Sequence, residues 1–242
     1  MRWTLLLACI LLNYACSKNL SKKDSIITKA AYINESPTIN GEPDEKLWQN
    51  LDWNPLGKNL EDENSDFSGK YKLGWNENGI YILMEIDHEH LMDFSINRTQ
   101  KMWKNDFIKI YIDEDNSGGL HHYNNNAFAY NVDLNGNVID LGPDKKPKFY
   151  NDHIISKYKT EGNTTRWELQ VKVFSDQYSD SKPTQPVVLI PNKKIGFALE
   201  YTDNDYRLNR QNHYASLFMP GEDENQGWIN ADIFGTLVLT KN

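Results

Sequence analysis

The feature that most constrains the fold is a two-residue alternation of apolar and polar side chains. It is clearest in RWELQVKVF, where the apolar residues are Trp167, Leu169, Val171 and Val173 and the polar residues are Arg166, Glu168, Gln170 and Lys172. Successive side chains of a strand point to opposite faces of the sheet. The segment therefore predicts a strand with one buried face and one face in water.

The same alternation predicts further strands separated by turns. Residues 70–75 and 80–87 flank the turn sequence NENG, which is typical of a hairpin. Other expected strands are FIKIYID, the segment NAFAYNVDL before a second Asn-Gly turn, IGFALEYTD and the terminal FGTLVLT. In INGEPDEKLWQN, Pro43 predicts the start of a short helix. We therefore expect an all-β fold, an antiparallel β-sandwich with jelly-roll-like and immunoglobulin-like layering and one short N-terminal helix.

The first 16 residues are typical of a secretory signal peptide. Arg2 precedes an apolar run, residues 5–12, that is much shorter than the roughly 20 residues needed to span a bilayer. Both cysteines, Cys9 and Cys16, lie in this segment, so the rest of the chain cannot form a disulfide bond. The sequence predicts export.

The end of this segment resembles the lipobox of bacterial lipoproteins, because Cys16 follows Ala15. The resemblance implies lipid on Cys16. Asn13 stands where a lipobox usually has Leu, so the alternative is simple cleavage near Ala15 and secretion. We expect a periplasmic, outer-membrane or cell-surface lipoprotein that touches a membrane only through this lipid.

After the signal peptide we expect a polar tether, residues 17–37, and one domain, residues 38–242. The formal net charge is −8, and the chain shows no basic cluster that could offset it. A nucleic-acid backbone would therefore be repelled. We expect no nucleic-acid partner.

The segment MWKNDFIKIYID places Trp103, Asp106 and a strand ending in Ile112-Asp113 in close succession. Four further motifs occur in the chain, namely INGEPDEKLW, KLGWNENGIYIL, IGFALEYTDND and GWINADIFGTLVL. Together, in this order, they make residues 38–240 similar to family 9 carbohydrate-binding modules, which belong to the DOMON-like β-sandwiches. The resemblance implies the same sandwich fold and a non-catalytic function, the capture of polysaccharide for catabolism.

In this family two tryptophans clamp a sugar, and the matching residues here are Trp103 and Trp228. Asn225 matches a polar position that contacts sugar hydroxyls. The clamp is physically reasonable because an indole can cover the apolar C–H face of a pyranose. The alternative is that these tryptophans belong to the core, which is what we expect of Trp75 and Trp167.

Two positions depart from the family pattern. Lys109 stands where the family has Glu, and Ala129 stands where it has Arg. We include Asp106 and Lys109 among the expected ligand-binding residues. Because the polar half of the site differs, the family's preference for the ends of sugar chains cannot be carried over, and binding itself could be lost.

The loop after residue 112 offers oxygen ligands at alternate positions, Asp113, Asp115 and Ser117, ahead of Gly118. This spacing matches the first half of an EF-hand loop, but the twelfth position is Asn124 instead of Glu. The family resemblance implies a structural Ca²⁺ at this loop, and the alternative is a solvated turn. We expect no organic cofactor.

Enzyme functions find less support. The chain has no Gly-x-Ser-x-Gly motif and no cysteine after residue 16. We expect solvated loop positions for the histidines, which are His88, His90, His121, His122, His153 and His213.

Two other functions stay open. One is a haem-binding electron-transfer sandwich, with Met84, Met102 or His213 as axial ligand. The other is an accessory part of a glycoside hydrolase, with the hydrolase or a glycan-uptake protein as partner.

Overall fold

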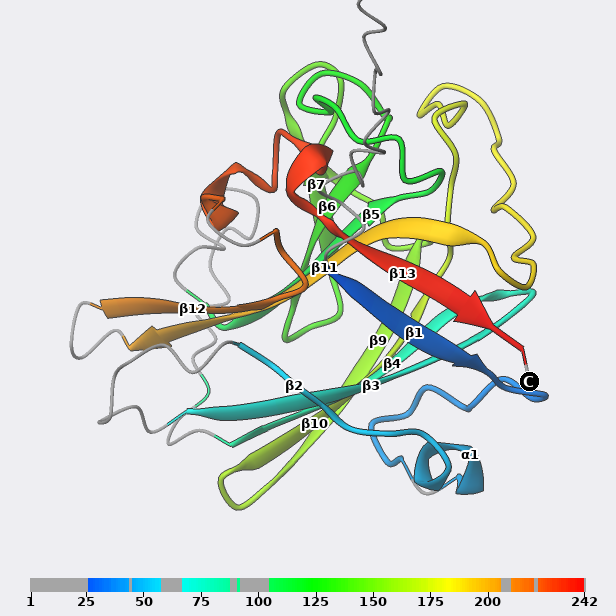
Figure 1. Ribbon diagram of the computed structural model, residues 1–242. Coiled ribbons are helices and arrows are strands. Elements are labelled where there is room, and N and C mark those ends of the chain that lie inside the picture. The colour runs from blue at the N-terminus through cyan, green and yellow to red at the C-terminus, as the bar shows by residue number, and fades with distance from the viewer. Residues whose placement is uncertain are drawn as a thin grey trace, which may run out of the picture.

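The structure is a computed structural model that describes residues 26–43, 45–57, 67–87, 91, 105–205, 210–219 and 222–241 (Figure 1). The strands are β1 Ile27–Tyr32, β2 Asn54–Pro55, β3 Ser68–Asn76, β4 Gly79–Asp87, β5 Phe107–Asp113, β6 Phe128–Asp133, β7 Val138–Leu141, β8 Pro147–Phe149, β9 Ile154–Glu161, β10 Thr164–Val171, β11 Lys194–Asp205, β12 Arg210–Ser216 and β13 Gly235–Thr240. The helices are α1 Lys46–Gln49 and the 3₁₀ turns η4 Glu224–Gln226 and η5 Ala231–Ile233. The all-β class predicted from the alternation is confirmed.

The strands form one continuous sheet in the order β8-β7-β6-β5-β11-β13-β1-β3-β4-β10-β9. β12 pairs with β11, and β2 pairs with β3. The sheet folds over itself, so that the half containing β5, β6 and β11 faces the half containing β3, β4 and β10 (Figure 1). The result is the expected sandwich.

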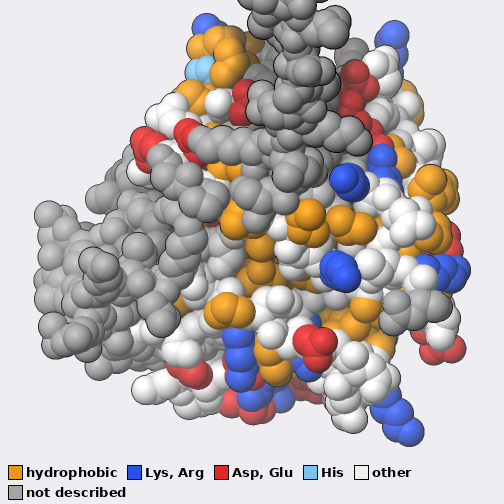
Figure 2. All heavy atoms as spheres, in the orientation of Figure 1, with side chains coloured by type: hydrophobic (Ala, Val, Ile, Leu, Met, Phe, Trp, Pro, Cys, Tyr) orange, Lys and Arg blue, Asp and Glu red, His pale blue; other side chains and the backbone are white. Residues whose placement is uncertain are grey.

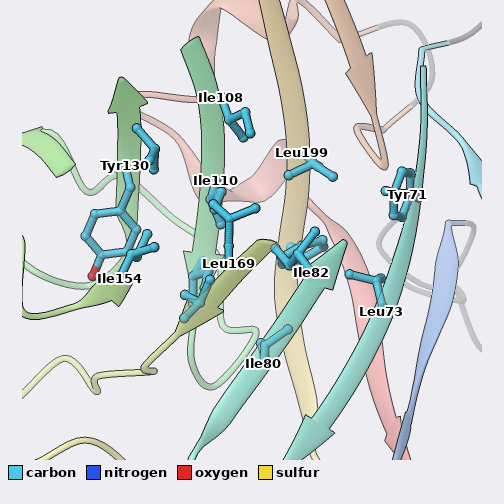
Figure 3. Packing of buried hydrophobic residues seen from close by; sticks show 14 of the residues in the cluster. Tyr71, Leu73, Ile80, Ile82, Ile108, Ile110, Tyr130, Ile154, Leu169 and Leu199 are labelled. Carbon is cyan, nitrogen blue, oxygen red and sulfur yellow. The ribbon is translucent and has the colours of Figure 1, made fainter. Parts of the chain in front are cut away.

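The main core fills the space between the two halves. In Figure 3, side chains from β3, β4 and β10 meet side chains from β5, β6 and β11. Trp167 and Leu169 of β10 are fully buried there, and so is Trp75 of β3. This confirms that Trp75 and Trp167 belong to the core, as the alternation predicts.

Strand β1 makes the sheet mixed. It pairs in parallel with β13, where Ile27 lies opposite Thr236, and also in parallel with β3, where Ala31 lies opposite Gly74. The other pairings among the described strands are antiparallel. β1 lies within residues 17–37, the stretch expected to be a tether, so the sheet includes residues that precede position 38.

The short helix exists, but α1 begins at Lys46 and not at Pro43. Glu45 is its N-cap residue and has an extended backbone. Trp48 of the helix and Leu51 just after it pack against the outer face of β4, where they meet Tyr81 and Leu83 in a second apolar cluster. Within the described residues, no helix is long and apolar enough to cross a membrane.

One residue of β10, Glu168, departs from the predicted alternation because α1 covers this part of the sheet. Glu168 was expected on the wet face, but it is fully buried. Its Oε1 accepts a hydrogen bond from Trp48 Nε1 (2.9 Å), and its Oε2 accepts from the backbone N–H groups of Gly41 (2.9 Å) and Asn40 (3.1 Å). One carboxylate therefore fastens the helix and the turn before it to the sheet.

Charged side chains of both signs share the remaining outer face of this half. In the view of Figure 2, Lys and Arg side chains lie near Asp and Glu side chains. Glu85 pairs with both Lys70 and Arg166 at 2.7 Å, and Lys159 pairs with Glu42 at 2.8 Å. The exposed pair between Lys159 and Glu42 contributes little to stability, since water screens it.

Candidate functional site

The candidate site lies on the outer face of β5, β6 and β11. Along β5 the residues Ile108 and Ile110 face the core, so Lys109 and Tyr111 face outward. The register places Lys109 opposite Glu200 of β11 and opposite Asn131 of β6. Strands β5, β6 and β11 thus bring polar side chains together on the face where the family resemblance predicts ligand contacts.

A hydrogen-bonded network links Lys109, Tyr111 and Thr202 to Glu200. Lys109 Nζ lies 2.6 Å from Glu200 Oε1, and the Tyr111 hydroxyl donates to Glu200 Oε2 at 3.0 Å. The Thr202 hydroxyl donates to Glu200 Oε1 at 3.2 Å. Glu200 is only 2 % exposed, whereas the Lys109 side chain keeps 19 % of its surface in water. The network therefore leaves part of the Lys109 side chain in water and keeps the Glu200 carboxylate buried.

Glu200 is a site residue that the sequence analysis did not identify. The family has its acid at the position of Lys109, and here an acid lies directly across on the neighbouring strand. The available signal was weak, because Glu200 is a single acid among the outward positions of IGFALEYTD. Only the strand register shows that it adjoins Lys109.

Ala129 occupies a covered position. It is buried in an apolar cluster with Tyr111, Phe218 and Phe234, formed where the segment before β13 crosses this face. Its backbone N–H donates to Asp140 Oδ2 at 2.8 Å. Burial raises the pKa of Asp140 to about 7, although backbone hydrogen bonds to the carboxylate act to lower it. The place where the family has Arg is thus closed by aromatic packing.

Trp228 lies in the loop between η4 and η5 and is 46 % exposed. Three hydrogen bonds join this loop and the following turn η5 to the segment after β5. Ala231 N donates to Gly119 O (2.8 Å), Gly119 N donates to Asp232 Oδ1 (2.9 Å), and His121 N donates to Ile229 O (2.9 Å). The indole therefore stands outside the core on a well-anchored backbone.

His121 anchors the same loop through its side chain. It is 5 % exposed, and its Nε2–H donates to the carbonyl of Gly227 at 2.9 Å. Burial lowers the pKa of His121 to about 4, and the hydrogen bond to Gly227 acts in the opposite direction. The expectation of a solvated loop histidine was wrong here, because the pairing of the two loops closes over the ring.

His153 was also expected in solvent and is fully buried. It stacks on Phe174, with ring centroids 4.0 Å apart, and its Nδ1 lies 2.7 Å from the Tyr130 hydroxyl. Burial lowers the pKa of His153 to about 4. Its surroundings are aromatic core residues, so its role is structural.

The titration of His121 leads to a prediction. Its folded pKa lies below the ordinary value, so the stability it provides is complete above about pH 6.5 and is lost as the pH falls toward 4. The parent should therefore lose about 1 kcal/mol more stability than His121→Gln between pH 7.5 and 5.5. Gln keeps an N–H for the Gly227 carbonyl but does not titrate. Urea unfolding of both proteins across this range measures the difference, and parallel curves would contradict it.

The other residues that the sequence predicts as ligand contacts lie in different structural environments. Trp103 lies outside the described residues. Asn225 is exposed in η4, and its backbone and side-chain N–H groups both donate to Asp223 Oδ1 at 3.0 Å. Asp106 is fully buried, and its Oδ1 accepts from Asn204 N at 2.8 Å. Asp106 thus fastens the start of β5 to β11, and its contact with a ligand stays a prediction.

The expected calcium loop closes on itself. The buried Asp113 carboxylate accepts from Gly118 N at 2.6 Å, and Asp115 Oδ1 accepts from Ser117 N at 2.9 Å. Burial acts to raise the pKa of Asp115, but the hydrogen bonds from Ser117 outweigh it and lower that pKa. Among the residues with described positions, no three Asp, Glu, His or Cys side chains gather as a metal site. Calcium binding at this loop stays a prediction.

The haem alternative receives no support from Met84, which is fully buried in the main core between the two halves. Met102 and the side chain of His213 lie outside what the structure describes. Cys16 also lies outside it.

Comparisons with solved structures show the same architecture in known proteins. Two are structures of a family 9 carbohydrate-binding module from Caldicellulosiruptor kristjanssonii, in complex with cellotriose and with glucose. Each is 19 % identical to this chain and covers 89 % of it, with TM-scores of 0.65 and 0.66 and with 94 % and 96 % of the module covered.

A third solved structure is a putative carbohydrate-binding protein from Bacteroides uniformis, 8 % identical, with a TM-score of 0.59. The match covers 88 % of this chain and 99 % of that one. A comparison with curated proteins finds no match. A family model described as "Carbohydrate family 9 binding domain-like" matches residues 39–242, which is most of the sequence. The chain therefore belongs to the carbohydrate family 9 binding domain-like family.

Proposed function

We propose that this protein binds carbohydrate without chemically changing it, and that a sugar ring lies between Trp103 and Trp228. The observation that carries the proposal is the half-exposed indole of Trp228 on a loop anchored by His121. Exposed aromatic rings on a rigid backbone suit the apolar face of a sugar. The related modules bound to cellotriose and glucose support this class of ligand.

Lys109 and Asn225 would supply the polar contacts. Lys109 has N–H groups beyond the one directed at Glu200, so its ammonium group can donate to sugar hydroxyls. Asn225 is exposed and has an amide oxygen that can accept from them. Glu200 would act by fixing the position of Lys109. This arrangement replaces the acid and the Arg that the family has at positions 109 and 129.

A direct test is calorimetry of the parent protein with glucose, cellotriose and a panel of plant, algal and host oligosaccharides. A disaccharide of about 23 heavy atoms at roughly 0.3 kcal/mol per atom gives at best about −7 kcal/mol, a Kd on the order of 10 µM. We expect at least one panel member to bind in the range of about 10 µM to 1 mM. A folded protein that binds no member at millimolar concentration would refute the proposed function.

We also propose that the protein is exported and carries lipid on Cys16, so that it captures glycans at a membrane surface for a hydrolase or an uptake partner. The basis is the lipobox-like end of the signal peptide. Mass spectrometry of the native N-terminus should find a lipid-modified Cys16, and the protein should partition into detergent. A native protein that begins downstream of Cys16, without lipid, would rule out the anchor.

Calcium binding at the loop after β5 is a separate proposal. A cation bound only by the folded state stabilises that state by mass action. We expect millimolar Ca²⁺ to raise the melting temperature by at least about 2 °C, and Asp115→Ala to remove this rise. If chelator leaves the melting curve of the parent unchanged, the loop functions as a turn held by its own hydrogen bonds.

A further inference from the structure

We infer that His122 and Tyr123 are positioning residues that fix the orientation of the Trp228 ring. Three rings and one cation form a continuous row at this surface. Lys145 Nζ lies 4.0 Å from the centroid of Tyr123, the His122 and Tyr123 centroids are 3.9 Å apart, and the His122 and Trp228 centroids are 4.5 Å apart. The members come from three separate loops, so the row exists only in the folded chain.

The distances show what each ring does. The His122 and Tyr123 rings make a tilted contact, with centroids 3.9 Å apart and 35° between their planes. Lys145 Nζ lies over the Tyr123 ring, 4.0 Å from its centroid, at cation–π distance. Tyr123 is 51 % exposed and contacts both His122 and Lys145. We infer from these contacts that it supports His122.

The contact between His122 and Trp228 is perpendicular, with an interplanar angle of 89° at 4.5 Å. Such a contact restricts rotation of the indole about its side-chain bonds, because a swing in either direction would collide with the imidazole or break the contact. The backbone of His122 is fixed in turn, since the adjacent His121 bonds to Ile229 and Gly227. The contact with His122 thus limits the motion of the Trp228 indole, which is 46 % exposed to solvent.

The far end of the row is fixed as well. Lys145 lies in a tight turn in which Gly142 N donates to Lys146 O at 2.9 Å and Lys145 N donates to Gly142 O at 2.8 Å. Lys145 has a φ of 65°, in the left-handed region that residues with a side chain seldom adopt. Lys145 therefore contacts Tyr123 from a turn that is held by its own hydrogen bonds.

The consequence for binding rests on the proposed function. An indole that is already oriented loses less freedom when a sugar stacks on it, and immobilising one such side chain costs affinity. We expect His122→Ala to weaken binding of the best panel glycan by about 3- to 10-fold, and His122→Phe to restore most of it. The melting temperature should stay within about 1 °C of the parent, because the row lies at the surface and buries little of the core.

The decisive measurement needs no ligand. The ¹⁵N heteronuclear NOE of the Trp228 indole N–H, assigned with Trp228→Phe, reports the motion of that ring. In the parent it should approach the value of Trp75, whose indole is fixed by a hydrogen bond to Thr240 O at 2.9 Å. It should fall in His122→Ala and in Tyr123→Ala, recover in His122→Phe, and stay unchanged in the control Phe149→Ala, which alters an exposed ring on β8.

An unchanged Trp228 NOE in His122→Ala would overturn the inference whether or not the protein binds sugar. A lowered NOE with undiminished affinity for a bound glycan would overturn the link between orientation and binding. If no glycan binds at all, the proposed function fails, and the NOE still decides whether His122 orients the indole.

Discussion

Replacing Glu168 by alanine should lower the free energy of unfolding by about 3–5 kcal/mol. The carboxylate is fully buried and accepts hydrogen bonds from Asn40, Gly41 and Trp48. Alanine would leave these donors unsatisfied beneath α1 and open a cavity beside the Trp48 indole. Urea unfolding monitored by circular dichroism measures the loss, which should appear as a lower midpoint with little change in slope.

Glu161→Ala is the matched control, because Glu161 is an exposed acid on the adjacent strand β9 and pairs with Arg166 and Lys159 at the surface. Its removal should cost less than about 1 kcal/mol. Glu168→Gln should fall between the two, since the amide keeps one acceptor oxygen. A loss below about 1 kcal/mol for Glu168→Ala would show that water replaces the carboxylate, and that the attachment of α1 does not depend on it.

The second large effect concerns the proposed sugar clamp. Trp103→Ala and Trp228→Ala should each weaken binding of the best glycan by about 2 kcal/mol, a roughly 30-fold loss, since about 100 Å² of apolar contact disappears. Both variants should remain folded. Trp167→Ala provides the contrast, because Trp167 is fully buried between β4 and β9 and its removal should cost about 3–5 kcal/mol of stability.

Calorimetry with each folded variant measures the affinity, and the melting temperature separates loss of binding from loss of fold. Equal affinity of the parent and both variants for a bound glycan would place the sugar elsewhere on the protein. A loss in only one variant would reduce the clamp to a single stacking surface. The second result would leave carbohydrate binding in place and remove the claim that two rings enclose the sugar.

The alternation predicted most of the strands because it reports directly which side chains face the core. It placed Trp167 and Leu169 correctly for this reason. Strand β1 was missed because ITKAAY has little alternation, and its parallel pairing with β13 at the other end of the chain depends on tertiary structure. Glu168 was misjudged for a related reason, since nothing in its own segment shows that α1 covers that part of the face.

The candidate site, too, could be predicted from the sequence only in part. Motifs predicted Trp228 and Lys109 as candidate site residues, because each occupies a recognisable position within a short segment. Glu200 could not be assigned in this way, because its partnership with Lys109 follows from the register of two strands far apart in sequence. His121 and His122 gain their roles only when their loop meets the loop of Trp228. Spacing along the chain contains no information about such contacts.

The central claim is that a sugar lies against the Trp228 indole, and the indole N–H signals of the protein test it directly. During titration of the ¹⁵N-labelled parent with the glycan that binds best, the signals of Trp228 and Trp103 should shift together and saturate at one Kd. The signals of the buried Trp48, Trp75 and Trp167 should stay in place. Saturation of binding by calorimetry while the Trp228 signal does not move would contradict the claim.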